Sequence, residues 1–152
     1  MIIVVCRDDP GLVTIAINSR QGHPGVFGAV HQVFGNPIPP LGANENLFLI
    51  SHGVKDGDDG NPTIGGAADD FWVNAVQLFE GLKGGNLFPP GYAGAVFIDA
   101  CEASDHDDDT FSFAEVFKAQ IQGWFGTVRV FGRSGAVGGL IPLPNANGWR
   151  EA

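Results

Sequence analysis

Two short runs of apolar residues place the tightest constraint on the fold. Residues 47–50 (LFLI) and 95–99 (AVFID) are continuously apolar up to their ends, which is typical of strands buried on both faces of a parallel sheet. Residues 67–82 and 111–122 follow these runs with apolar residues at helical spacing, and 127–131 (TVRVF) is a further strand. Strands that alternate with helices are parallel and joined by right-handed crossovers. The sequence therefore predicts an α/β fold, a three-layer α/β/α sandwich with a mainly parallel central sheet.

The two ends of the chain give weaker signals. Residues 2–6 and 12–17 are β-branched runs around Arg-Asp-Asp-Pro-Gly, which predicts two strands joined by a turn. Residues 18–46 are rich in Gly, Pro and Asn and support only a short helix near 27–34. The tail from Gly135 onwards resembles a loop. A capping residue before the second helix is expected at Thr110 or Ser112.

Composition limits the classes of function. The 152 residues fit one domain, 1–152, and no apolar run is long enough to span a membrane. The formal net charge of −9 argues against nucleic acid as a partner, because phosphate binding requires clustered Lys and Arg. With two cysteines and no export signal, a cytoplasmic location is expected. Cys6 lies inside an apolar run and is expected to be structural.

Two reactive side chains follow the two central strands. His52 lies two residues past Ile50, and Cys101 lies two residues past Asp99. If the strands are neighbours, both side chains emerge at the carboxyl edge of the sheet, where open α/β sheets bind ligands. An imidazole beside a thiol favours the nucleophilic thiolate and can protonate a leaving amine. The backbone N–H groups of Gly53 and Cys101 are candidates for an oxyanion hole.

These residues resemble the caspase-like clan of cysteine peptidases, which includes caspases, metacaspases, legumain, gingipain and clostripain. The resemblance lies in an apolar strand ending in His-Gly, at residues 47–53, followed by an apolar strand ending in Asp-Ala-Cys, at residues 95–101. The two reactive residues are 101 − 52 = 49 positions apart, against roughly 50 in caspases. The resemblance to this clan covers about residues 46–134. The family implies a cysteine endopeptidase with a Cys-His dyad, a polypeptide substrate, and no cofactor required for the chemistry.

The resemblance also implies substrate-binding and metal-binding residues. Clostripain-like and metacaspase-like members carry an acid two residues before the nucleophile, so Asp99 is the candidate for selecting Arg or Lys at the cleavage site. Ser134 is a candidate for lining the cleft. Some members bind Ca²⁺, and a cluster after the second strand offers hard oxygen ligands, namely Asp105, Asp107, Asp108 and Asp109. The same acids would oppose the thiolate by their negative field.

Other interpretations of these residues stay open at the level of sequence. Cys101 alone is compatible with a buried structural thiol, and the acidic clusters with solvated loops. Two further functions fit the chain: a catalytically inactive interaction module with a caspase-like fold, and an acidic calcium-binding protein without chemistry.

Overall fold

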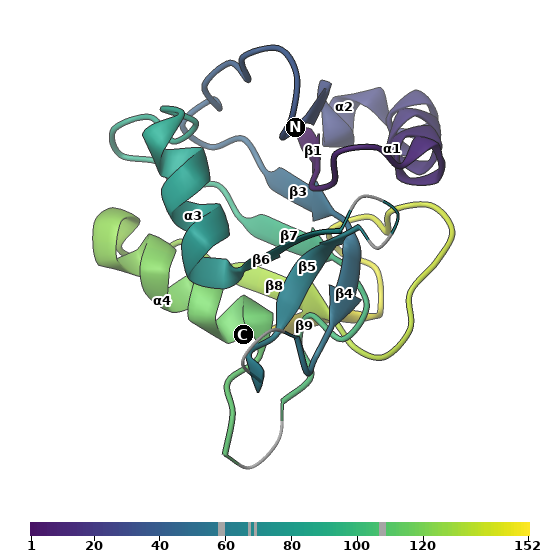
Figure 1. Ribbon diagram of the computed structural model, residues 1–152. Coiled ribbons are helices and arrows are strands. Elements are labelled where there is room, and N and C mark those ends of the chain that lie inside the picture. The colour runs from purple at the N-terminus through teal and green to yellow at the C-terminus, as the bar shows by residue number, and fades with distance from the viewer. Residues whose placement is uncertain (58–59, 67, 69, 107–108) are drawn as a thin grey trace.

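A six-stranded sheet forms the centre of the computed structural model, which describes residues 1–57, 60–66, 68, 70–106 and 109–152. The strands lie in the order β2-β1-β3-β7-β8-β9 (Figure 1). The first five pair in parallel, and only the last pair is antiparallel. The prediction of a mainly parallel sheet is therefore confirmed. The six strands are β1 (Ile2–Val4), β2 (Val30–Gln32), β3 (Leu47–Ile50), β7 (Val96–Asp99), β8 (Val130–Arg133) and β9 (Trp149–Glu151).

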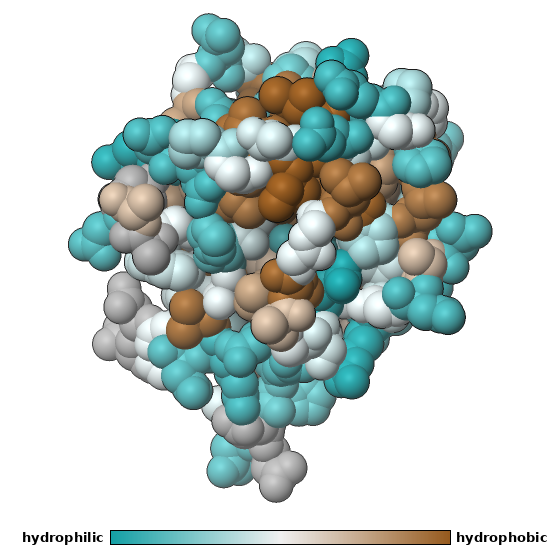
Figure 2. Space-filling view, turned by 90° about the vertical axis from the view of Figure 1, so that its right-hand side faces the viewer, coloured by the Kyte–Doolittle hydropathy of each residue, from teal (hydrophilic) through white to brown (hydrophobic). Residues whose placement is uncertain are grey.

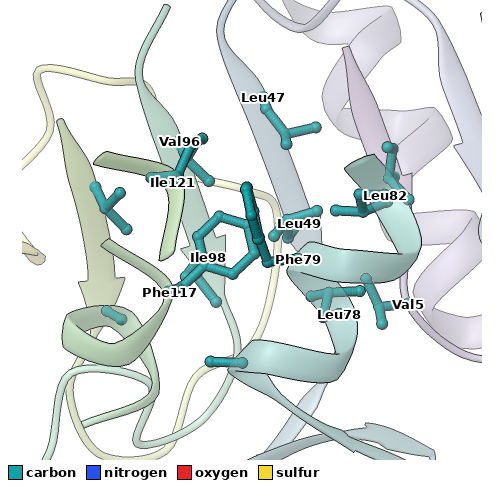
Figure 3. Packing of buried hydrophobic residues seen from close by; sticks show 14 of the residues in the cluster. Val5, Leu47, Leu49, Leu78, Phe79, Leu82, Val96, Ile98, Phe117 and Ile121 are labelled. Carbon is teal, nitrogen blue, oxygen red and sulfur yellow. The ribbon is translucent and has the colours of Figure 1, made fainter. Parts of the chain in front are cut away.

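Helices cover both faces of this sheet, so that it is the middle of three layers (Figure 1). α3 (Ala75–Gly84) and α4 (Phe113–Phe125) pack on one face, where Phe79 and Phe117 meet Leu49 and Ile98 (Figure 3). α1 (Pro10–Gly22) and α2 (Pro24–Phe27) lie on the opposite face, over the second apolar cluster. We call these the α3/α4 face and the α1 face. Side chains of each strand alternate between them, as a strand buried on both sides requires.

The predicted strand at residues 12–17 is wrong, because this segment belongs to helix α1. Asp9 caps the helix, accepting a hydrogen bond from the Leu12 N–H at 3.0 Å, and Pro10 occupies the first helical position. β-Branched residues weaken a helix by only a few tenths of a kcal/mol each. The helix buries Leu12, Ala16 and Ser19 along one stripe, and this packing outweighs the local preference.

The predicted helix at residues 67–82 is correct only in its second part. Phe71–Asn74 forms strand β6, and α3 begins after a capping box in which Asn74 and Gln77 bond each other's backbone N–H at 2.9 and 3.0 Å. β6 completes a small antiparallel sheet with β4 (His52–Val54) and β5 (Thr63–Gly66). The sequence did not predict this sheet. Its first strand carries the candidate catalytic histidine.

The C-terminal half follows the prediction more closely. Ser112 is the N-cap of α4 and shares a capping box with Glu115, as one of the two expected capping residues. Strand β8 begins at Val130 instead of residue 127, and the tail expected to be a loop contains β9. The short helix expected near 27–34 is also wrong, since α2 ends at Phe27 and the edge strand β2 follows. Within the described parts of the chain, none of the helices has the length and apolar character needed to cross a bilayer.

Candidate active site at the carboxyl edge of the sheet

The strands that precede His52 and Cys101 are neighbours, as the sequence analysis required. β3 pairs with β7 in parallel, and Ile50 is the register partner of Asp99. The pairing continues past the strand ends, where the Ser51 N–H donates to the Asp99 carbonyl at 3.3 Å. His52 and Cys101 thus each lie two residues beyond a matched pair. They leave the sheet side by side at its carboxyl edge.

The strand order places these residues beside the point where the chain changes direction across the sheet. From β1 the chain runs outward to β2, and from β3 it runs the other way through β7 to β8. Loops that leave β1 and β3 therefore diverge, and such a switch point is where doubly wound α/β proteins hold their ligands. Asp9 follows β1 and His52 follows β3. The candidate site occupies the position that this topology favours for binding.

Gly53 brings the two reactive segments into contact. A Cβ atom on residue 53 would lie 2.0 Å from the Cys101 carbonyl oxygen and 3.1 Å from its nitrogen, which is closer than side chains tolerate. Only glycine permits this approach, because it has no Cβ. The backbones of the two residues predicted to form an oxyanion hole are thereby packed against each other. Their role as an oxyanion hole remains a prediction.

His52 has a carboxylate partner that the sequence analysis missed. Its Nε2 lies 2.8 Å from Oδ2 of Asp9, and the histidine side chain is 50% exposed. The other oxygen of the Asp9 carboxylate accepts from the Leu12 N–H, and this hydrogen bond, together with His52, holds the Asp9 pKa below its usual value. Asp9 is therefore ionised at neutral pH and fixed by the start of α1. The Asp9-Pro10 pair, a helix-start signature, was the available signal for it.

The sulfur of Cys101 contacts the loop that follows β8. The Val137 N–H donates to Sγ at 3.3 Å, and the thiol faces the Val137 carbonyl at 3.9 Å. The Glu102 N–H also donates to the Gly135 carbonyl at 2.9 Å, which attaches the same loop to the turn carrying the nucleophile. Cys101 is partly buried, whereas Cys6 is fully buried in the apolar cluster of the α1 face, which agrees with the structural role expected of Cys6.

The carboxylate predicted to select a basic substrate residue already has a basic partner. Nη1 of Arg133 lies 3.0 Å from Oδ1 of Asp99, and the two side chains are only 18% and 7% exposed. Burial raises the Asp99 pKa to about 6, and the nearby guanidinium limits that rise. Arg133 ends strand β8, which is paired with β7, and the sequence alone did not reveal that neighbour.

The acidic turn after β7 is engaged in the protein's own contacts. Asp105 accepts from the Ser134 hydroxyl and, at 2.6 Å, from the Gly135 N–H. Burial opposes its ionisation, but these hydrogen bonds hold the Asp105 pKa below its usual value. Ser134, the predicted cleft residue, therefore lies against the predicted metal ligand.

The structure leaves the calcium prediction untested. Asp107 and Asp108 lie outside the described residues, and Asp109 lies on the far side of that gap. In the ranges that the structure does describe, no group of three or more His, Cys, Asp or Glu side chains is placed to hold a metal ion.

The site residues share one face of the sheet. Ile50 packs into the cluster of the α1 face, as does Phe97, and alternation places Asp99 on that same side. Contacts of His52 with the start of α1, and of Cys101 with the loop after β8, agree with this placement. Figure 2 shows the surface that carries α1 and this loop, where hydrophobic residues gather in the middle, with hydrophilic ones around them. Leu140, three residues after the Val137 that contacts the Cys101 sulfur, is 57% exposed.

Comparisons with family models, curated proteins and solved structures return no match to this chain. The interpretation of the site therefore rests on its own residues and their geometry.

Proposed function

We propose that the protein is a cysteine endopeptidase of the caspase-like type, with Cys101 as nucleophile and His52 as general acid and base. The observation that carries the proposal is the packing of the Gly53 backbone against Cys101 beside a histidine anchored by Asp9. The imidazole of His52 pairs with the Asp9 carboxylate, and the segments that carry His52 and Cys101 follow neighbouring strands where the topology favours a ligand. A buried structural cysteine would need neither of the other two groups.

The chemistry follows the usual course for a thiol nucleophile. The thiolate of Cys101 attacks the carbonyl carbon of the scissile peptide, a C–S bond forms, and the carbonyl electron pair moves onto oxygen. The N–H groups of Gly53 and Cys101 are the proposed donors to that oxyanion. As the intermediate collapses, the C–N bond breaks and protonated His52 gives its proton to the leaving amine. Water activated by His52 then attacks the thioester, which releases the acid and restores the thiol.

Asp9 has a positioning role in this scheme. Its contact with Nε2 of His52 leaves the other ring nitrogen, Nδ1, for proton transfer. An ionised carboxylate also stabilises the imidazolium that forms beside the thiolate. Cleavage after Arg or Lys is the specificity that we propose, with Asp99 as the acid beneath the nucleophile and Ser134 beside the cleft.

Substitution of the nucleophile tests the proposal. Wild type and Cys101→Ala are incubated with peptides that carry Arg, Lys, Ala or Asp at the cleavage position, with and without calcium. We expect hydrolysis by wild type to fall to background in the variant, with Arg and Lys peptides preferred. Equal hydrolysis by the two proteins would contradict the mechanism, whereas cleavage after Asp alone would contradict only the specificity.

A catalytically inactive interaction module is the second candidate, and the contact of Val137 with the Cys101 sulfur favours it. Labelling by iodoacetamide, mapped by mass spectrometry, separates the two functions. An enzyme should label at Cys101 while the buried Cys6 stays unmodified in the folded chain. Equal, slow labelling of both cysteines would favour the inactive module.

A further inference from the structure

Three different groups surround the guanidinium of Arg133: a carboxylate, an aromatic ring and a glycine backbone. Its Nη1 is 3.0 Å from the Asp99 carboxylate, and its Cζ lies 5.4 Å from the centre of the Trp149 ring. A Cβ on Gly148 would lie 3.8 Å from the Arg133 Nε and 3.9 Å from Cζ and Nη2, so the Gly148 backbone closes a further side. A buried acid, an aromatic ring and a bare backbone are the groups with which a protein recognises a guanidinium.

The segment that supplies Arg133 also covers the nucleophile. Four residues further on, the Val137 N–H donates to the Cys101 sulfur. One continuous stretch, residues 133–137, thus contacts both the carboxylate proposed to choose the substrate and the thiol proposed to attack it. A purely structural ion pair at the end of β8 would not require the second contact.

We infer that Arg133 is a specificity-determining residue, which pairs with the Asp99 carboxylate, so that a basic substrate side chain reaches this carboxylate only in competition with Arg133. The inference rests on the proposed function, since it concerns the substrate of that same site. Asp99 and Arg133 are both largely buried, so a second cation reaches the carboxylate only when the Arg133 side chain moves aside. The wild-type preference for Arg and Lys peptides over neutral ones should therefore be smaller than that of a variant without Arg133.

Kinetics with Arg133→Gln test this inference. Glutamine keeps a hydrogen-bond donor near Asp99 but removes the charge. We expect kcat/KM for an Arg peptide to rise by about ten-fold or more, while kcat/KM for the matching citrulline peptide, which is uncharged, stays unchanged. Asp99→Asn in the same background should abolish the gain. Arg129→Gln is the matched control, because Arg129 precedes the same strand but is 62% exposed and pairs with Glu151.

A binding measurement separates failure of this inference from failure of the proposed function. Agmatine, a small guanidinium compound, should raise the melting temperature of Arg133→Gln and Arg133→Ala but not that of wild type or of the double variant with Asp99→Asn. This readout requires no catalysis, so it holds even if no peptide is cleaved. Absence of a shift in both single variants would overturn the inference. Loss of cleavage after Asp in Arg133→Gln would also overturn it, because Arg133 would then be binding an acidic substrate.

Discussion

Replacing Gly53 by alanine tests the contact that joins the two halves of the candidate site. The new Cβ would lie 2.0 Å from the Cys101 carbonyl oxygen, and real Cβ atoms almost never approach another atom closer than 3.0 Å. The two backbones must therefore separate by at least 3.0 − 2.0 = 1.0 Å. A displacement of about 1 Å between catalytic groups lowers rates by roughly 100-fold, or about 2.7 kcal/mol of activation free energy. We expect that loss in kcat/KM for Gly53→Ala.

The assay combines peptide hydrolysis with urea unfolding, because the two readouts separate a damaged site from a damaged fold. The contact lies at the edge of the sheet, so the free energy of unfolding should fall by much less than that of a core truncation. Gly123→Ala is the control: Gly123 is exposed in α4, nothing lies within 4 Å of its added Cβ, and the change should stabilise the helix by up to about 1 kcal/mol. Full activity in Gly53→Ala would refute the assigned geometry.

Two further substitutions address the charges of the site. Asp9→Asn retains a good N-cap for α1, so the free energy of unfolding should change by less than about 0.5 kcal/mol. Because the variant lacks the Asp9 carboxylate charge beside His52, kcat should nevertheless fall by about ten-fold or more in steady-state assays. An unchanged kcat would remove Asp9 from the mechanism. Burial raises the Asp99 pKa from 3.8 to about 6, so the folded chain binds this proton more tightly than the unfolded chain. The free energy of unfolding attributable to Asp99 is therefore largest below pH 4 and falls as pH rises through about 6, by at most roughly 3 kcal/mol. Urea unfolding of wild type and Asp99→Asn across pH 4–8 measures this contribution as the difference between their free energies of unfolding. If that difference shifts in favour of wild type as the pH rises, the expected pH dependence is wrong.

The parts of the fold that follow the sequence prediction are those in which local pattern and burial agree. Residues 47–50 and 96–98 are apolar throughout and form the greater part of two buried central strands. The start of α4 carries both halves of a capping box, so its position was predictable within a residue or two. His52 and Cys101 each follow one of these two strands by two residues, and their position at the carboxyl edge of the sheet was therefore accessible from sequence.

The errors occur where tertiary contacts override the local pattern. Residues 12–17 have the composition of a strand, yet Asp9 and Pro10 start a helix that packs on the sheet. Residues 71–74 extend a helical pattern, but they pair with Thr63–Gly66 and complete the small sheet that presents His52. A period of apolar residues does not indicate which partner strand lies nearby in space.

The charged partners of His52 and Asp99 could not be predicted from the sequence either, because they too depend on which strands are neighbours. Asp9 and His52 are 43 residues apart, and Asp99 and Arg133 are 34 apart. Strand order alone brings each pair together, through β1 beside β3 and β7 beside β8. An acid after one strand and a base after another become an ion pair only once those strands are known to be neighbours.

The basic partners of Asp99 and Asp105 also weaken the argument that nearby acids oppose a thiolate at Cys101. The sequence placed acids around the nucleophile, and a negative field raises the free energy of a thiolate. In the structure, however, the Asp99 carboxylate is offset by Arg133 at 3.0 Å, and Asp105 lies 4.0 Å from the guanidinium of Arg150. The two acids therefore act on the sulfur as parts of ion pairs, whose fields decrease faster with distance than that of a single charge.

The sulfur additionally receives a hydrogen bond, from the Val137 N–H at 3.3 Å. The remaining acids that make up the net charge of −9 act through solvent, where charges more than about 8 Å apart are largely screened at physiological salt. Reactivity of Cys101 is thus governed by its nearest neighbours. Adding salt should change its alkylation rate far less than Asp9→Asn, which removes a charge fixed beside His52.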